Sequence, residues 1–174
     1  MKGAIMHCLG ELIKSNYGND KWEDSLEKAG ISRKAFFMPG QNVEDASVIK
    51  VIQSVCGVLK ISPAQAADAF GSYWVNTYAP KLYGEYYKGS NSAKEFLLKM
   101  DGVHEKVTKS ISDAHPPRFE YEWKNDKTLV VTYKSHRGLI DICIGLIKGV
   151  GKYFKENLDV TKLGSDKIQI IFSN

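Results

Sequence analysis

The stretch FEYEWKNDKTLVVTY, residues 119–133, decides the fold class that this sequence predicts. Apolar and charged residues alternate over 119–123, and apolar residues recur at 129, 131 and 133, which is the two-residue period of β-strands. The polar residues 124–127 between the two runs are typical of a turn. The stretch therefore predicts an antiparallel β-hairpin.

The chain on either side of the hairpin predicts mainly helices. Apolar residues there recur at helical spacing, and glycine or proline stands at most joints. Ser62 is a suitable N-cap before Pro63, and Pro80 is expected to stop the helix that begins there. The predicted helices cover about 5–17, 20–28, 43–59, 63–79, 92–111 and 139–154, and short strands follow at about 158–160 and 167–172. The fold class expected is α+β, an N-terminal helical subdomain packed on a small antiparallel sheet with helices.

Composition narrows the classes of function. The 174 residues can bury a substantial core, and the 24 basic and 20 acidic residues are scattered without a basic run that would indicate nucleic-acid binding. Cys8, Cys56 and Cys143 lie in apolar surroundings, which favours reduced thiols and a cytoplasmic location over a disulfide framework. No segment approaches the ~18 apolar residues of a membrane span, so neither export nor membrane insertion is expected.

His104 is a candidate ligand because it lies on a helical apolar surface with Met100, Val103 and Val107. A histidine in such a position can equally be a packing or surface residue. His7, His115 and His136 show no paired spacing of the kind that binds zinc. Haem needs only one protein ligand, together with apolar walls and partners for two carboxylates. A single inward histidine is therefore compatible with haem.

Tyr133, Ser135 and Arg137 could provide those carboxylate partners. Alternate residues of a strand point to one face, and all three side chains donate hydrogen bonds. Arginine holds a carboxylate through two parallel bonds that are stronger than neutral hydrogen bonds. The three residues predict an anion clamp, and the alternative is a solvent-exposed strand face that is polar without a ligand.

An ordered set of short motifs resembles the haem nitric oxide/oxygen binding (H-NOX) family, whose domains stand alone in bacteria and are fused within soluble guanylate cyclases. The resemblance spans nearly the whole chain and favours the stand-alone bacterial type. Its motifs are Met1-Lys2-Gly3, Tyr17-Gly18-Asn19-Asp20, Ala69-Phe70-Gly71 with Tyr73-Trp74, Asp101-Gly102-Val103-His104, Pro116-Pro117-Arg118, Tyr133-x-Ser135-x-Arg137 and Gly145-Leu146-Ile147-x-Gly149.

The resemblance implies one haem domain over residues 1–174. About 1–60 would form a distal helical subdomain and about 61–174 a proximal α/β subdomain, with haem b buried between them. By the same resemblance, His104 is the iron ligand and Pro117 packs against the macrocycle and distorts it. The other implied cofactor-binding residues are Tyr133, Ser135 and Arg137 at the propionates, Met100, and the distal-pocket residues Ile5, Leu9, Trp74, Tyr78, Ile142 and Leu146.

The identity of the gas ligand is predicted from the residue at position 142, which is isoleucine. Family members that hold oxygen stably use a tyrosine at the matching position, and Ile142 cannot donate a hydrogen bond. Bound oxygen gains from such a bond, whereas nitric oxide on ferrous iron needs it little. The resemblance therefore implies a sensor of nitric oxide that also takes carbon monoxide and rejects oxygen. Trp74, Tyr73 or Tyr78 could supply a substitute donor.

The function expected is signal detection. Nitric oxide would weaken or break the iron bond to His104, and the change of shape would regulate a separate histidine kinase or cyclic-di-GMP enzyme. The alternatives are storage or transport of haem or gas, a haem-free module that binds an anionic lipid or metabolite at Arg137, and an enzyme such as a peroxidase. An enzyme is disfavoured because the expected distal wall has neither histidine nor arginine. No zinc site is expected, since Cys143 is the only cysteine in the C-terminal part.

Overall fold

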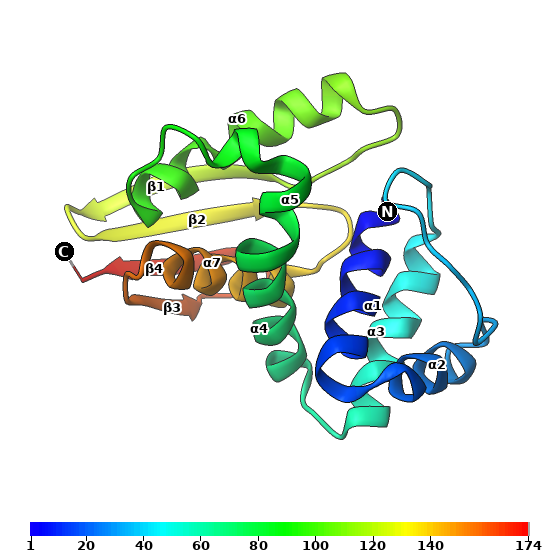
Figure 1. Ribbon diagram of the computed structural model, residues 1–174. Coiled ribbons are helices and arrows are strands. Elements are labelled where there is room, and N and C mark those ends of the chain that lie inside the picture. Colours follow the sequence, from blue (N-terminus) through cyan, green and yellow to red (C-terminus); the bar gives the residue numbers. More distant parts are fainter. Residues whose placement is uncertain (174) are drawn as a thin grey trace. The chain divides into compact units, whose positions relative to one another are not determined.

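The computed structural model describes residues 1–173 and divides the chain into two compact units. The first unit is Met1–Ala66, and the second runs from Ala67 onward. Figure 1 shows the order of the elements, from the helices of the first unit in blue and cyan to the strands that end the chain in red. Each unit has its own buried apolar residues, which are described separately below.

Three helices lie wholly within the first unit. They are α1 (Ala4–Tyr17), α2 (Asn19–Lys28) and α3 (Asp45–Leu59), close to the predicted ranges. The side chains that are fully buried in this unit come from all three helices and include Met6, Ile13, Leu26, Val48 and Val51. The apolar stripe that predicted α1 is thus its buried face.

A helix that changes its winding begins in the last residues of the first unit and continues into the second. It runs through α4 (Pro63–Tyr73), the π-helical turn η1 (Trp74–Tyr78), α5 (Ala79–Tyr83) and the 3₁₀ turn η2 (Gly84–Tyr87). Ser62 caps it as predicted, since the Ser62 hydroxyl accepts from the amide of Gln65 at 3.1 Å.

The prediction that Pro80 ends this helix is wrong. Proline lacks an N–H and its ring clashes with the carbonyl four residues earlier, so it usually breaks an α-helix. Here the backbone N–H of Ala79 bonds to the carbonyl of Trp74, five residues back, and this wider turn lets the chain continue through Pro80. The Asn76 amide holds the turn in place by donating to the carbonyls of Ser72 and Gly149, at 2.9 and 3.1 Å.

The rest of the second unit contains two helices and four strands. These are α6 (Ala93–Ser110), β1 (Arg118–Asn125), β2 (Thr128–Lys134), α7 (Ile140–Phe154), β3 (Leu158–Lys162) and β4 (Lys167–Phe172). The strands form one antiparallel sheet in the order β1-β2-β4-β3. The predicted hairpin and the α+β class are confirmed.

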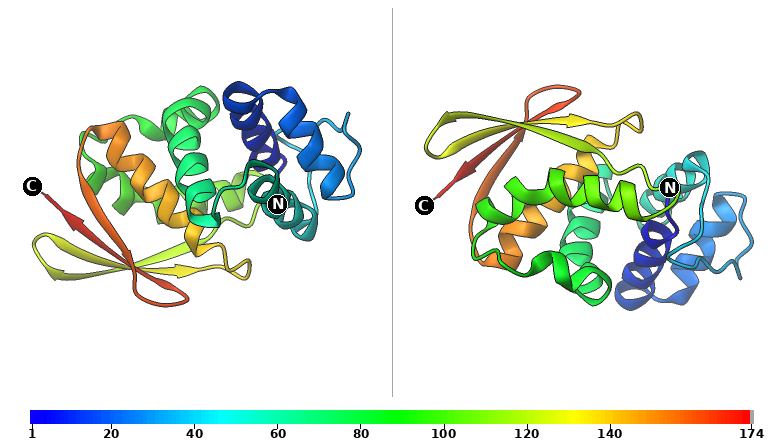
Figure 2. Two further views of the ribbon diagram at one scale, coloured as in Figure 1. Left: turned by 90° about the horizontal axis from the view of Figure 1, so that it is seen from below. Right: turned by 90° about the horizontal axis from the view of Figure 1, so that it is seen from above.

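The sheet buries one face against helices. Alternate residues of β4 are buried, and in β2 the buried residues are Leu129, Val131, Tyr133 and also Val130. The register pairs Leu129 with Ile170 and Val131 with Ile168. Figure 2 shows α7 between this sheet and α4. Because Cβ atoms alternate along a strand, the period of two in the sequence becomes the buried face of the sheet.

The packing of α4 on α7 depends on glycine. A Cβ on Gly71 would lie 2.0 Å from the backbone carbon of Gly145, and one on Gly145 would lie 2.1 Å from the carbonyl oxygen of Ala67. The two backbones are thus too close for any larger residue. The motif glycines of the sequence therefore have a packing role, which holds α4 and the π-helical turn beside α7.

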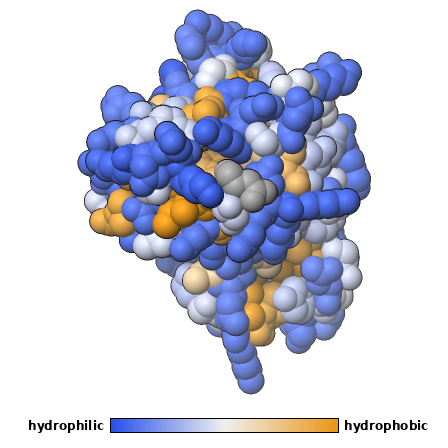
Figure 3. Space-filling model, turned by 90° about the vertical axis from the view of Figure 1, so that its left-hand side faces the viewer, coloured by the Kyte–Doolittle hydropathy of each residue, from blue (hydrophilic) through white to orange (hydrophobic). Residues whose placement is uncertain are grey.

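Within residues 1–173, no single helix has the length and hydropathy needed to cross a membrane. The helices Asp45–Leu59 and Pro63–Tyr87 meet these two requirements only when they are taken together, across a break between them. The face drawn in Figure 3 is mainly hydrophilic, with hydrophobic residues gathered in small patches.

Candidate functional site

His104 lies on α6, half-buried, with one ring nitrogen already committed. Its Nδ1 is 2.7 Å from the carbonyl oxygen of Pro117. Because a carbonyl oxygen only accepts, Nδ1 must carry the proton, and the lone pair of the neutral ring is on Nε2. Burial lowers the pKa of His104, which favours this neutral form. The arrangement is the one a histidine needs to bind a metal through Nε2.

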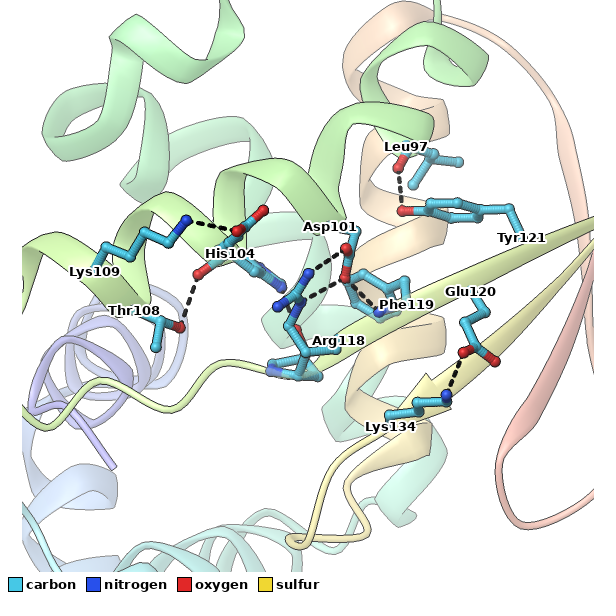
Figure 4. A network of polar contacts seen from close by, with 12 residues as sticks. Leu97, Asp101, His104, Thr108, Lys109, Arg118, Phe119, Glu120, Tyr121 and Lys134 are labelled. Carbon is cyan, nitrogen blue, oxygen red and sulfur yellow. Dashed lines mark hydrogen bonds and ion pairs between the residues drawn. The ribbon is translucent and has the colours of Figure 1, made fainter.

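One helical turn before His104, the carboxylate of Asp101 holds the start of β1. It accepts from Arg118 through Nε at 2.8 Å and Nη2 at 2.6 Å, and its Oδ1 also accepts the backbone N–H of Phe119 at 2.7 Å (Figure 4). The hydrogen bonds from Arg118 are the main reason why the pKa of Asp101 falls to about 2. Asp101 is therefore ionised at neutral pH, and its carboxylate is hydrogen-bonded to residues of β1.

The ring of Phe119 connects His104 to Tyr133. The ring centroids of His104 and Phe119 are 5.3 Å apart, and those of Phe119 and Tyr133 are 6.3 Å apart. Tyr133 is buried on β2, and burial raises the pKa of its phenol, so the hydroxyl keeps its proton. A protonated hydroxyl at this position can donate to an anion.

The three predicted clamp residues do not share a strand face. Strand β2 ends at Lys134, so Ser135 lies outside it and Arg137 lies in the turn that follows. Gly138 has φ of +63°, a conformation that favours glycine, and the chain turns there towards α7 instead of extending. The expectation that alternation along a strand aligns Tyr133, Ser135 and Arg137 is thus wrong.

The turn nevertheless keeps these side chains near one another. The backbone N–H of Arg137 donates to the hydroxyl of Ser135 at 3.2 Å, and a side-chain hydrogen bond links Ser135 to Tyr133. Arg137 also donates through Nη1 to the carbonyl of His115 at 2.5 Å, two residues before Pro117. The predicted clamp and the predicted iron ligand are therefore tied to the same segment, residues 115–119.

A cavity of about 610 Å³ lies beside α6. It is lined by residues of α5 and η2 and by two residues of the α6 side, in full Pro80, Lys81, Leu82, Tyr83, Gly84, Glu85, Tyr86, Val107 and Ile111. Val107 follows His104 by about one turn of α6, whereas Ile111 lies just beyond the end of the helix. All the predicted site residues lie within residues 1–173, and none of them lines this cavity.

The remaining predicted site residues lie in four elements. Trp74 lies in an aromatic stack, with its ring 5.8 Å from Phe70 and 5.3 Å from the buried Tyr78. Met100 is half-buried on α6, and Ile142 and Leu146 are half-buried one turn apart on α7. Ile5 and Leu9 belong to α1 of the first unit, half-buried and buried respectively. The second unit contains every predicted site residue except these last two.

Several residues of this site have no predicted role in the sequence. Asp101 and Arg118 occur there only as parts of motifs, although the three-residue spacing of Asp101 and His104 on a helix could have indicated a shared face. Leu82 and Ile111 line the cavity while 49% and 37% exposed, and no periodicity distinguishes them from other apolar residues.

A family model described as haem-NO-binding matches residues 2–162. The chain belongs to this family. The resemblance predicted from the sequence motifs is confirmed, and H-NOX domains bind haem and sense gases. Similar full-length proteins are the soluble guanylate cyclases gcy-32 and gcy-34 of Caenorhabditis elegans, each 28% identical over 97% of this chain. The chain spans only 25% of their length.

Solved H-NOX structures resemble the whole chain. One is an oxygen-binding H-NOX domain related to soluble guanylate cyclases, with 26% identity, a TM-score of 0.83, and coverage of 100% of this chain and 96% of that one. Another, from a study of haem distortion in the H-NOX family, has 26% identity and a TM-score of 0.85 with the same coverage. A third, from a study of H-NOX activation, has 26% identity, a TM-score of 0.85, and coverage of 100% and 97%.

Proposed function

We propose that this chain is a haem-based nitric oxide sensor. In this proposal His104 binds the iron of ferrous haem b, nitric oxide and carbon monoxide are ligands, and oxygen is excluded. The observation that carries the proposal is the bond from His104 Nδ1 to the Pro117 carbonyl, because it leaves the Nε2 lone pair for iron. When bound, haem supplies the centre to which diatomic gases attach.

The residues around His104 fit such a group. A half-buried neutral imidazole is the usual proximal ligand of a gas-binding haem. Tyr133, Ser135 and Arg137 offer two hydroxyls and one guanidinium, which suit the two carboxylates of haem. We assign these groups, with Pro117 and Met100, to the proximal side.

Discrimination against oxygen is assigned to α7. Ile142 has no hydrogen-bond donor and lies one turn from Leu146, so this part of the wall is apolar. We assign Ile5, Leu9, Trp74 and Tyr78 to the same distal wall, following the family resemblance. Tyr78 is only 3% exposed and stacks on Trp74, which supports packing roles for both. An H-NOX relative binds oxygen, so the choice of gas depends on such local residues and not on the fold.

Signalling requires that a structural change at His104 reach the surface of the protein. His104 bonds to Pro117, and the next residue, Arg118, begins β1, so a displacement of the ring acts directly on the sheet. A sensor also needs a partner that binds the two states with different affinity. We propose a histidine kinase or a cyclic-di-GMP enzyme for this part, with the chain as a non-catalytic domain of distal (about 1–60) and proximal (about 61–174) halves. The free Cys8, Cys56 and Cys143 support a reducing cytoplasm.

The test of haem binding is an absorption spectrum of the ferrous protein under argon, carbon monoxide, nitric oxide and air. Wild type is expected to form carbonyl and nitrosyl complexes and no stable oxygen complex, and His104→Ala is expected to lose the iron–histidine signature. His7→Ala, which removes a histidine of the first unit, is the control. A colourless wild-type protein after haem supply contradicts the proposal, and a stable oxygen complex contradicts the role of Ile142.

Sensing is tested separately with a partner. Autophosphorylation of a candidate histidine kinase, or turnover by a cyclic-di-GMP enzyme, is measured with the ligand-free and the nitrosyl protein. A sensor changes the partner's rate between these two states. Equal rates with every partner that binds the chain would favour storage or transport of the gas.

A further inference from the structure

Two side chains of α6 hold consecutive peptide groups at the start of β1. His104 donates to the carbonyl of Pro117, and Asp101 accepts the N–H of Phe119 at 2.7 Å. Asp101 and His104 are three residues apart and therefore project from the same side of the helix. Between the two held groups, Arg118 returns to Asp101 through two hydrogen bonds (Figure 4). We call Asp101, Arg118 and the Phe119 N–H the Asp101 clasp.

We propose that Asp101 and Arg118 are positioning residues that hold the Pro117 carbonyl against His104 and so fix the tautomer with the proton on Nδ1. Neither side chain needs to touch the ring, because each acts through the backbone of residues 117–119. The inference rests on the proposed function only where it identifies His104 as the iron ligand. It adds a reason why Nε2 is the nitrogen available to iron before haem is bound.

The geometry of the clasp explains why it can hold a carbonyl in place. Arg118 meets Asp101 with two parallel hydrogen bonds from its planar guanidinium, and such pairs fix orientation as well as distance. The same carboxylate takes a third bond from the backbone, so the Arg118–Phe119 peptide cannot rotate without breaking it. The Pro117 carbonyl, one peptide earlier, is thereby held towards α6. Partners of this kind commonly set the tautomer of a metal-binding histidine.

The same helix provides a matched control. Glu105, one residue beyond His104, pairs with Lys109 at 2.7 Å, whereas the hydrogen bonds of the clasp all go to Asp101. Replacing Glu105 by glutamine removes a negative charge near His104 and leaves the bonds of the clasp in place. Glu105→Gln therefore shows whether the loss of a carboxylate next to His104 in sequence shifts the tautomer while the bonds of the clasp remain.

The test is the tautomer of His104 in the haem-free full chain, read from long-range ¹H–¹⁵N correlation at a pH about 2 units above the ordinary histidine pKa. Wild type and Glu105→Gln are expected to show the Nδ1–H form. Asp101→Ala is expected to shift the ratio roughly 2- to 12-fold towards Nε2–H, the range that one hydrogen bond of ordinary net strength allows. Arg118→Lys keeps the positive charge but cannot make the two parallel hydrogen bonds of a guanidinium. It is expected to shift the tautomer ratio less than Arg118→Ala does.

An unchanged tautomer in both Asp101→Ala and Arg118→Ala overturns the proposal. Should Asp101→Ala fail to fold, Arg118→Ala still decides, because the Arg118 side chain is 47% exposed and its removal leaves the core intact. A second readout is the iron–histidine stretching band of the haem-loaded ferrous protein, expected to shift or broaden in the clasp variants only. A band that persists in His104→Ala would contradict the proposed function. The tautomer measurement would still test the role of the clasp.

Discussion

Replacing Gly145 by alanine is expected to destabilise the second unit by separating α4 from α7. The new Cβ would lie 2.1 Å from the carbonyl oxygen of Ala67, whereas ordinary contact begins at 3.4 Å, so the helices must move apart by about 1.3 Å. Overpacking of this kind costs about 1–3 kcal/mol, and the obstacle here is backbone, which has no other rotamer. Alanine recovers about 0.5–1 kcal/mol of helix propensity. A net loss of about 1 kcal/mol lowers the Tm by roughly 2–4 °C in a chain of this size.

The assay is thermal unfolding followed by far-ultraviolet circular dichroism, with Gly102→Ala as the matched control. Gly102 also lies inside a helix, but a Cβ there would meet no atom of residues 1–173 within 4 Å beyond its own stretch of helix. This control is expected to gain about 0.5–1 kcal/mol from propensity alone. The opposite signs of the two substitutions are the critical result. A Tm of Gly145→Ala equal to or above that of wild type would refute the packing argument.

Three further outcomes are expected. Ile142→Tyr adds a donor to α7 and should raise oxygen affinity roughly 2- to 12-fold, measured by oxygen titration of the ferrous protein; no change would contradict its place on the distal wall. Leu129→Ala, at a fully buried position of β2, should cost about 2–5 kcal/mol in urea unfolding, and a loss below about 1 kcal/mol would argue against the described core. Burial raises the pKa of Cys143 from 9.0 to about 12, so above pH 9 the unfolded chain loses this proton first and stability falls as pH rises; below pH 9 the thiol has no effect. Cys143→Ala should lose this component of the pH dependence, as unfolding at pH values on either side of 9 will show.

The order of residue types along the chain predicted the helices and strands well where interactions between neighbouring residues determine them. Ser62 and Ser92 cap their helices through their own hydroxyls, and alternation over residues 119–133 became the hairpin. The prediction was wrong where a contact between residues distant in sequence overrode the usual effect of a residue type. Pro80 stays within a helix because the π-helical turn before it is held by the bond of Asn76 to Gly149 on α7, far along the chain.

The candidate site also has features that the sequence predicts and features that only the tertiary structure shows. The sequence by itself determined the family, through motifs whose order and spacing span the chain, and with it His104 and the residues 133, 135 and 137 as candidates. Only the tertiary structure decided how these residues meet. The proton of His104 is placed by a carbonyl thirteen residues away, and Arg137 reaches His115 from a turn instead of a strand face. Hydrogen bonds between segments distant in sequence have no periodicity, so no pattern along the chain can reveal them.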